Sequence, residues 1–245
     1  MSKSSVLLSL AAAGCLATLC YATAAHAQVV YSNDFETNTN GFTSASTSLQ
    51  PTDGQGFGVS PESAYLGRFS NGTVSLALTG LEIGTTYTVE MDLFIGATWD
   101  GGGDVFQLGV DGGSFLVNSS FGNFGNQSYS DATPATGPGS SFAPLTGADF
   151  LNFGANNSLR YSIYYFSKGA GNPVLQFIPT ATTAQLNFIG TGLQEVTDEY
   201  WAVDNVVVRG PGVVAVPEAG TTGLLAIGGS FVGIGAIVAR RRFNK

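Results

Sequence analysis

The sequence contains few of the side chains on which catalytic and redox chemistry depends. Its 245 residues include two cysteines and one histidine, and all three, Cys15, Cys20 and His26, precede residue 28. From residue 28 onward there is no thiol nucleophile, no Ser–His pair and no histidine ligand for a metal. A disulfide within that part of the chain is excluded as well.

Charge is scarce too, and it is unevenly distributed. Charged residues make up 11% of the chain, against roughly 25% in ordinary domains. Between residues 28 and 212 the basic residues are Arg68, Arg160, Lys168 and Arg209, whereas every acid of the chain except Glu218 lies there. The formal charge of this region is therefore 4 − 16 = −12. Such a surface repels nucleic acid, which we exclude as a partner, and attracts divalent cations.

The first 27 residues have the layout of a secretory signal peptide. Lys3 is followed by an apolar stretch and then by Ala25-His26-Ala27. A basic start, a short apolar region and an Ala-x-Ala site predict cleavage after Ala27. A lipoprotein signal ending at Cys15 is an alternative, but Ala12 stands three places earlier, where a large aliphatic residue is expected. We expect an exported protein.

The last thirty or so residues form a second signal. No charged residue occurs from residue 223 to residue 239, and Arg240-Arg241-Arg242 follows directly. An apolar run of roughly 17–25 residues can cross a bilayer as a helix, here at about residues 221–239. The arginines predict that its end stays on the cytoplasmic side. The alternative, a buried helix of the globular domain, would show a polar face at helical spacing, and this run shows none.

The order of features in residues 213–245 resembles the PEP-CTERM sorting signal of Gram-negative bacteria. Val216-Pro217-Glu218 precedes the apolar run and the arginines. The family usually has Pro-Glu-Pro, and Ala219 stands here in place of the second proline. The resemblance implies an exosortase-type enzyme as partner, which would process the tail near Pro217-Glu218. It also implies transient anchoring in the inner membrane, followed by release to the cell surface or beyond.

Residues 28–212 predict a single all-β domain, a jelly-roll-like β-sandwich, because short apolar runs alternate with Gly, Asn and Asp turns. Asn71-Gly72 and Asp111-Gly112-Gly113 predict hairpins. Residues 119–157 predict a long loop of functional importance, and the Gly-rich residues 100–104 a surface loop. The expected strands are residues 29–31, 64–69, 73–78, 86–95, 105–110, 114–118, 159–166, 174–178, 185–189 and 201–208.

The end of this domain has a second resemblance. Tyr200-Trp201-Ala202-Val203-Asp204-Asn205-Val206, with Trp99-Asp100-Gly101 upstream, is similar to concanavalin-like and galactose-binding-like jelly rolls. These folds include carbohydrate-binding modules, some with a structural calcium near the first and last strands. The resemblance implies Glu36 and Asp204 as calcium ligands, although Asp204 capping a turn is an equal alternative. Trp99 is a candidate sugar-stacking platform or, alternatively, a packing residue.

An enzymatic function has weaker support. Glu90-Met91-Asp92 is similar to the first half of the Glu-x-Asp-x-x-Glu strand of jelly-roll glycoside hydrolases, but the next acid is Asp100. Retaining hydrolysis needs a second carboxylate about 5 Å from the first. We therefore expect no enzyme, and a structural or adhesive role in exopolysaccharide or biofilm. A carbohydrate-binding module is the alternative, and a glycoside hydrolase is less favoured.

Overall fold

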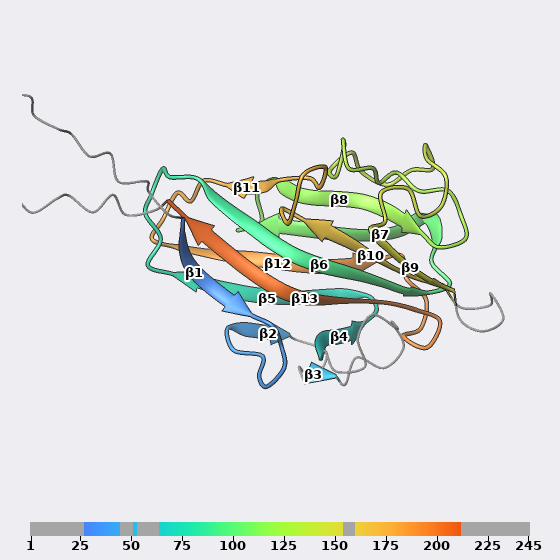
Figure 1. Cartoon of the computed structure of the whole chain (residues 1–245), viewed down its shortest axis with the longest axis horizontal. Coiled ribbons are helices and arrows are strands. Elements are labelled where there is room, and N and C mark those ends of the chain that lie inside the picture. Colours follow the sequence, from blue (N-terminus) through green and yellow to red (C-terminus); the bar gives the residue numbers. More distant parts are fainter. Residues whose placement is uncertain (1–26, 45–50, 53–63, 154–159, 212–245) are drawn as a thin grey trace, which may run out of the picture. The chain divides into compact units, whose positions relative to one another are not determined.

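A computed structural model describes residues 27–44, 51–52, 64–153 and 160–211, all of which lie in one compact unit, His26–Val213. Every regular element in these ranges is a β-strand (Figure 1). The strands are β1 (Gln28–Asn33), β2 (Phe42–Ser44), β3 (Pro51–Thr52), β4 (Tyr65–Phe69), β5 (Gly72–Thr79), β6 (Tyr87–Ala97), β7 (Asp100–Val110), β8 (Phe115–Gly122), β9 (Phe150–Phe153), β10 (Arg160–Phe166), β11 (Leu175–Phe177), β12 (Thr183–Thr191) and β13 (Glu199–Gly210).

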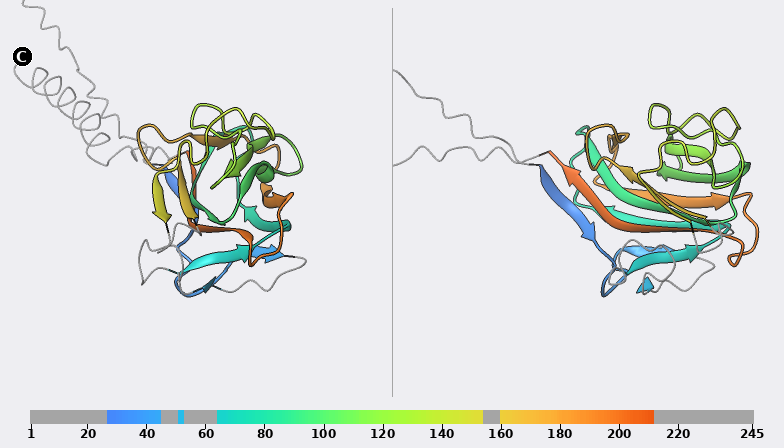
Figure 2. Two further views of the ribbon diagram at one scale, coloured as in Figure 1. Left: turned by 90° about the vertical axis from the view of Figure 1, so that its right-hand side faces the viewer. Right: turned by 45° about the vertical axis from the view of Figure 1, so that its right-hand side comes forward.

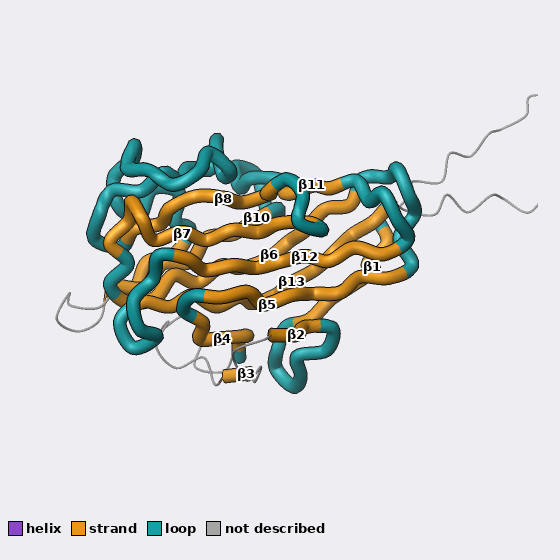
Figure 3. Tube along the Cα trace, turned by 180° about the vertical axis from the view of Figure 1, so that it is seen from behind, coloured by secondary structure: helices purple, strands orange, loops and turns teal. Residues whose placement is uncertain are grey.

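The strands form two antiparallel sheets that pack face to face (Figures 1 and 3). Sheet A has the order β3-β4-β13-β6-β10-β9, with β1 also paired to β13 and β11 to β6. Sheet B has the order β2-β5-β12-β7-β8. The inner orders 4-13-6-10 and 5-12-7-8, with connections that pass between the sheets, are those of a jelly roll. The predicted all-β sandwich is confirmed.

Strand β6 shows how the sequence builds the core. Tyr87, Val89 and Met91 alternate with polar residues, and in a strand alternate side chains point to opposite faces. These three side chains are buried in the main core between the sheets. Trp201 on the neighbouring strand β13 lies in the same core, with its ring centroid 4.8 Å from that of Phe69 and 5.2 Å from that of Phe106.

The hairpin predicted at Asn71-Gly72 does not form. Strands β4 and β5 flank this pair, but β4 belongs to sheet A and β5 to sheet B. The Asn71 amide donates to the carbonyl of Leu193 at 2.5 Å, and its oxygen accepts the Leu193 N–H at 2.9 Å. The turn residues therefore direct the chain from one sheet to the other, because Asn71 bonds to a distant loop.

The Gly-rich residues 100–104 are likewise not a surface loop but the first part of β7. Asp100 begins β7, and the register against β8 shifts between Asp100 and Val105, which marks an irregular strand start. Gly101 and Gly102 adopt positive φ there, a conformation that glycine allows at little cost. The second predicted hairpin is confirmed: the turn at Asp111 joins β7 to β8.

Residues 119–157 are shorter as a loop than predicted, because β8 extends to Gly122 and β9 begins at Phe150. The segment between them is held by the buried side chain of Gln127. Its amide donates to the carbonyls of Tyr129 at 3.0 Å and Thr146 at 2.9 Å, and its oxygen accepts the N–H of Gly122 at 3.1 Å. One side chain thus ties the segment together.

The first and last strands of the domain are neighbours. Strand β1 pairs antiparallel with β13, so that Gln28 lies opposite Gly210 and Asn33 opposite Val206 (Figure 2). The first and last described strands therefore begin and end at the same end of the sandwich. Within the described ranges there is no helix long and apolar enough to span a membrane. The span expected at about residues 221–239 lies outside those ranges.

Candidate functional site

The outer face of sheet A, which points away from sheet B, carries a second apolar cluster separate from the core. We call its six aromatic side chains the aromatic face: Tyr65, Phe94, Phe150, Tyr161, Tyr165 and Tyr200. They come from five strands, β4, β6, β9, β10 and β13. Three of these rings are buried: Tyr65 and Tyr200 are each 2% exposed and Phe94 is 4% exposed. The other three, Phe150, Tyr161 and Tyr165, are partly exposed, so they are the rings of this face that a ligand can reach.

Strand register explains why these residues lie together. Across β10, β6 and β13, Tyr161 is opposite Gly96 and Gly96 is opposite Tyr200. A Cβ at Gly96 would lie 2.3 Å from the Tyr200 ring, so the glycine leaves the space that this ring occupies. The ring centroids of Tyr161 and Tyr200 are 6.5 Å apart. Because Gly96 on the central strand has no side chain, the rings of Tyr161 and Tyr200 can approach each other over it.

The aromatic face continues toward β4. The rings of Tyr65 and Phe94 stack with their centroids 5.5 Å apart. The Arg68 guanidinium lies 4.6 Å from the centre of the Tyr200 ring and donates from Nε to the Tyr65 hydroxyl at 3.3 Å. A cation over an aromatic ring is a favourable contact, and this one fixes Tyr200.

Charged side chains border the aromatic face farther along the same strands. Tyr165 lies opposite Asp92. The ammonium of Lys168 is 2.6 Å from Asp92 Oδ1 and 5.2 Å from the centre of the Tyr165 ring. The amide of Asn205 donates to Asp92 Oδ2 at 2.9 Å. A cation, an anion and an amide are therefore held in fixed positions beside Tyr165.

A second ion pair involves Glu90, which lies two residues before Asp92 on β6. Arg209 donates from Nε to Glu90 Oε1 at 2.6 Å and from Nη2 to Oε2 at 3.2 Å. Such two-point pairs hold the guanidinium in a defined orientation. Glu90 and Asp92 are thus both paired with basic side chains.

Tyr165 and Tyr200 keep their protons at neutral pH. Burial raises the pKa of Tyr165, and the carboxylates of Asp92 and Asp149 raise it further. Burial also raises the pKa of Tyr200, although the charge of Arg68 opposes part of that effect. Protonated phenols can both donate and accept hydrogen bonds, and of these two the partly exposed Tyr165 is the one that can do so at the surface.

Trp99 has no exposed surface. Its indole N–H donates to the carbonyl of Tyr200 at 3.1 Å, and its ring packs edge-on against Phe121. A ring without exposed surface cannot offer a face to a sugar. The structure therefore assigns Trp99 to the core, the alternative that the sequence left open, and corrects its predicted glycan contact.

The two residues implied as calcium ligands lie on neighbouring segments. Pairing of β1 with β13 places the chain after Asn33, which includes Glu36, beside the part of β13 that holds Asp204. Glu36 Oε1 accepts the N–H of Ala64 at 2.9 Å, and Asp204, 3% exposed, accepts the N–H of Asn205 at 2.6 Å. The two segments are therefore adjacent, whereas the two carboxylates bond to different backbone groups.

That adjacency alone does not complete a calcium site. Calcium takes six to eight oxygens, including backbone carbonyls. In the described part of the chain, no group of three or more His, Cys, Asp or Glu residues is placed to hold a metal. Asp204 lies within β13 where the register against β6 shifts, and its carboxylate bonds there to the next backbone N–H. Calcium binding by Glu36 and Asp204 remains a prediction.

The predicted processing residues fall mostly beyond the described ranges. Ala27 is exposed and directly precedes β1. Ala25 and the sorting-motif residues Val216, Pro217, Glu218, Arg240, Arg241 and Arg242 lie outside.

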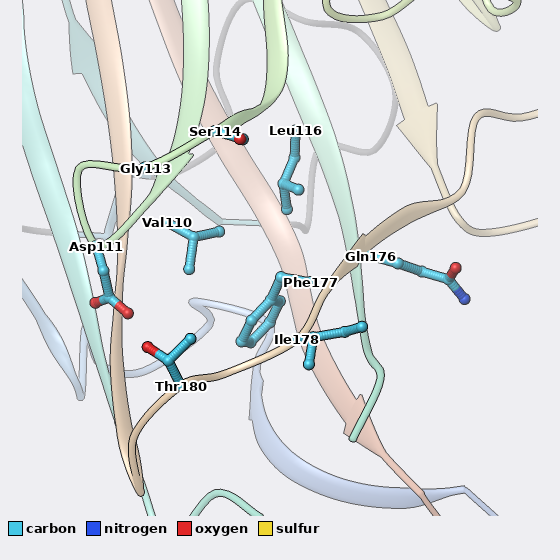
Figure 4. Close-up of a pocket in the computed structure, with 9 residues that line it drawn as sticks. All are labelled: Val110, Asp111, Gly113, Ser114, Leu116, Gln176, Phe177, Ile178 and Thr180. Carbon is cyan, nitrogen blue, oxygen red and sulfur yellow. The ribbon is translucent and has the colours of Figure 1, made fainter. Parts of the chain in front are cut away.

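A pocket of about 480 Å³ opens between the β7–β8 hairpin and the segment that follows β11 (Figure 4). Val110, Leu116 and Phe177 contribute apolar side chains, and Asp111 lies on the rim. Asp111 Oδ1 accepts the N–H of Gln185 at 2.6 Å. The pocket shares no residue with the aromatic face, and its one aromatic ring, Phe177, is 7% exposed. The pocket is therefore a less favourable place for a ligand ring to stack on an aromatic side chain.

No protein-family model matches this sequence, and no curated protein matches it. Among solved structures, the sandwich resembles the CBM22-1 xylan-binding domain of Xyn10C from Paenibacillus barcinonensis, with 14% identity and a TM-score of 0.40 over 78% of this chain and 99% of that one. The mosquito-larvicidal Cry4Aa toxin from Bacillus thuringiensis is similar at 11% identity and a TM-score of 0.32, over 69% of this chain and 22% of that one. At these values the likeness concerns general architecture alone.

Sequence reasoning missed the aromatic face because its signal is ambiguous. In β10, Tyr161, Ile163 and Tyr165 alternate with Ser162, Tyr164 and Phe166. Both sets are mainly apolar or aromatic, so the period of two does not show which set points outward. In the structure Tyr164 and Phe166 enter the core, whereas Tyr161 and Tyr165 do not.

Proposed function

We propose that this domain binds a neutral polysaccharide along the outer face of sheet A. The observation that carries the proposal is the aromatic face with fixed polar groups at its border. Tyr161 and Tyr165, both only half-buried, lie on the same side of β10. At about 3.3 Å per residue they are about 13 Å apart along the strand. That distance suits an extended chain of several sugar rings.

The chemistry of the face matches that of a sugar chain. Pyranose rings present apolar C–H surfaces that pack on aromatic faces, and hydroxyl groups at their edges. Half-buried tyrosines supply the first kind of contact at a small entropic cost, since their rings are already held in place. Asp92, Lys168 and Asn205 supply the second, because their mutual bonds fix their positions before a ligand arrives.

The charge of the domain narrows the ligand class. Residues 28–212 carry a formal charge of −12, and like charges at an interface oppose binding. An acidic polysaccharide would meet this repulsion, whereas a neutral one would not. We therefore propose a neutral glycan in place of an anionic one.

The cellular setting in this proposal comes from the sequence. The signal peptide of residues 1–27 and the sorting-type tail of residues 213–245 support export, processing by an exosortase-type enzyme and final placement at the cell surface or in the extracellular matrix. A domain that binds matrix polysaccharide there would have an adhesive role. The ligand-binding and structural interpretations are compatible in that sense.

Affinity electrophoresis of the full-length protein tests the proposal. It would be run in gels that contain soluble neutral polysaccharides or, in parallel, acidic ones. We expect retardation by at least one neutral polysaccharide and a loss of about two- to tenfold in affinity for Tyr161→Ala and Tyr165→Ala, since stacking contacts of this kind are worth about 0.5–1.5 kcal/mol each.

The matched control is Phe115→Ala. Phe115 is an aromatic residue, 39% exposed, on β8 of sheet B. Its loss should leave retardation unchanged. Retardation that survives both tyrosine substitutions, or that Phe115→Ala abolishes, would place binding elsewhere, and absence of retardation by every neutral polysaccharide would overturn the proposal.

A further inference from the structure

A carboxyl group lies sealed between the two sheets at the end of the sandwich farthest from Gln28 and Gly210. Glu199, the first residue of β13, has no exposed surface. Its Oε2 accepts the N–H of Gln194 at 2.7 Å. Its Oε1 is buried, and no hydrogen-bond donor of the described residues reaches it. A buried acceptor without a donor is costly, so the orphaned oxygen requires an explanation.

The side chain that faces Glu199 is another acid. Asp104, 7% exposed, belongs to β7 of sheet B, and its carboxyl interacts directly with that of Glu199. Asp104 Oδ2 already accepts the N–H of Asp100 at 2.5 Å. Each acid thus uses one oxygen for a backbone N–H. The remaining oxygen of Glu199, Oε1, therefore faces only the carboxyl of Asp104 among the described residues.

We propose that Glu199 and Asp104 share a proton, and that this O–H···O bond is a pH-sensitive clasp between sheet A and sheet B. A protonated Glu199 would donate from Oε1 to the Asp104 carboxylate, which gives the orphaned oxygen its partner. When the proton is lost, two buried carboxylates face each other, and their repulsion opposes the packing of the two sheets. The folded state is then weakest where the pair is fully ionised.

The electrostatic surroundings of Glu199 favour its protonated form. Burial raises the pKa of Glu199 to about 7, against an ordinary value of 4.5, and repulsion from Asp104, Asp100 and Asp198 adds to the effect, although the N–H of Gln194 opposes it. Burial also raises the pKa of Asp104. The charged groups that act on the pair from β7 and from the turn before β13 are therefore acids. Glu195, in the same loop, is exposed.

A bound cation is a less suitable explanation for the pair. Calcium needs six to eight oxygens, and backbone N–H groups already occupy one oxygen of each acid. No group of three or more acidic or other metal-binding side chains in the described ranges is arranged around a common point. A single proton satisfies the geometry without further ligands.

The raised pKa of Glu199 determines whether the stability of the folded domain rises or falls with pH. Between pH 4.5 and about 7 the folded state holds a proton that the unfolded state has lost. Stability therefore falls as pH rises through that interval. Most acids act in the opposite sense, because ion pairs lower their pKa in the folded state. The clasp thus favours the folded domain in mildly acidic surroundings.

The test is urea unfolding of the full-length protein between about pH 5 and about pH 9, followed by tryptophan fluorescence. Trp99 contacts the residue after Glu199 through its bond to the Tyr200 carbonyl, so it reports on this region. We expect the wild-type midpoint to fall with an inflection near pH 7. Glu199→Gln keeps a donor toward Asp104 without a titrating group, and its midpoint should lack that inflection.

Two further variants keep the proposal falsifiable. Asp104→Asn supplies an amide donor to Glu199 and should move the inflection to lower pH. Glu195→Gln removes an exposed acid of the same loop and should leave the wild-type inflection in place. A wild-type curve that coincides with that of Glu199→Gln would overturn the proposal. So would stabilisation of the wild type by Ca²⁺ at high pH that Glu199→Gln abolishes, because a cation would then be the partner.

Discussion

The ring of Tyr200 lies against the backbone of Gly96 on the neighbouring strand, where any side chain would collide with it. A Cβ built at Gly96 would come within 2.3 Å of the Tyr200 ring. The glycine is thus a specific requirement of the aromatic face. It leaves room for the Tyr200 ring, which also contacts the Arg68 guanidinium and lies beside the Tyr161 ring.

Gly96→Ala should therefore destabilise the domain by about 1–3 kcal/mol, the usual cost of overpacking, and should displace Tyr200. Urea unfolding measures the first effect and glycan affinity of the folded protein the second. Gly103→Ala is the matched control, since Gly103 also lies outside the positive-φ region and a Cβ there would meet nothing within 4 Å. Equal effects of the two substitutions would show that the Tyr200–Gly96 contact has no special role.

Trp99→Phe should reduce stability without reducing glycan affinity. The substitution removes the indole N–H that bonds to the Tyr200 carbonyl, and an unsatisfied buried carbonyl costs about 1–3 kcal/mol. Denaturant midpoints and affinity electrophoresis of the same preparation separate the two effects. A variant with weaker glycan binding and unchanged stability would return Trp99 to the role of a sugar platform.

Calcium should raise the melting temperature of the full-length protein after EDTA treatment if Glu36 and Asp204 bind it. A ligand that binds the folded state alone, at 100 times its dissociation constant, adds about 2.7 kcal/mol. Asp204→Asn should abolish the rise, whereas Glu82→Gln, at an exposed acid, should not. No rise in the wild type would contradict calcium binding by Asp204, whose carboxylate accepts the N–H of Asn205.

Processing should yield a protein whose first residue is Gln28, as intact-mass analysis of exported protein would show. Replacement of Pro217-Glu218 by Ala-Ala should prevent removal of the tail and leave the protein in the membrane fraction. A lipid-modified N-terminus at Cys15 would instead support the lipoprotein alternative.

Local patterns in the sequence predicted the parts of the fold that depend on neighbouring residues. The alternation around Tyr87 and Met91 predicted β6, and Asp111-Gly112 predicted a hairpin, because side-chain period and turn geometry are local properties. Asn71-Gly72 has the same local signal as a hairpin. The bonds of Asn71 to Leu193 decide otherwise, and no local pattern contains them.

The candidate site was less predictable, because it depends on which strands become neighbours. Trp99 stands beside glycines in the sequence, yet its ring is fully buried and packs against Phe121. The pair of Glu199 and Asp104 joins distant segments of the sequence from opposite sheets. Such contacts arise from topology, which composition and periodicity do not determine.

The pairing of β13 also has a mechanical consequence. Strand β13 is hydrogen-bonded to β6 along one edge and to β1 and β4 along the other. A pull on the chain at Gly210, directed along β13, would have to slide this strand against neighbours on both sides, so that many backbone hydrogen bonds share the load at once. A pull across the strands would break them one after another. The domain should therefore resist tension best when it is drawn along β13 from its C-terminal end.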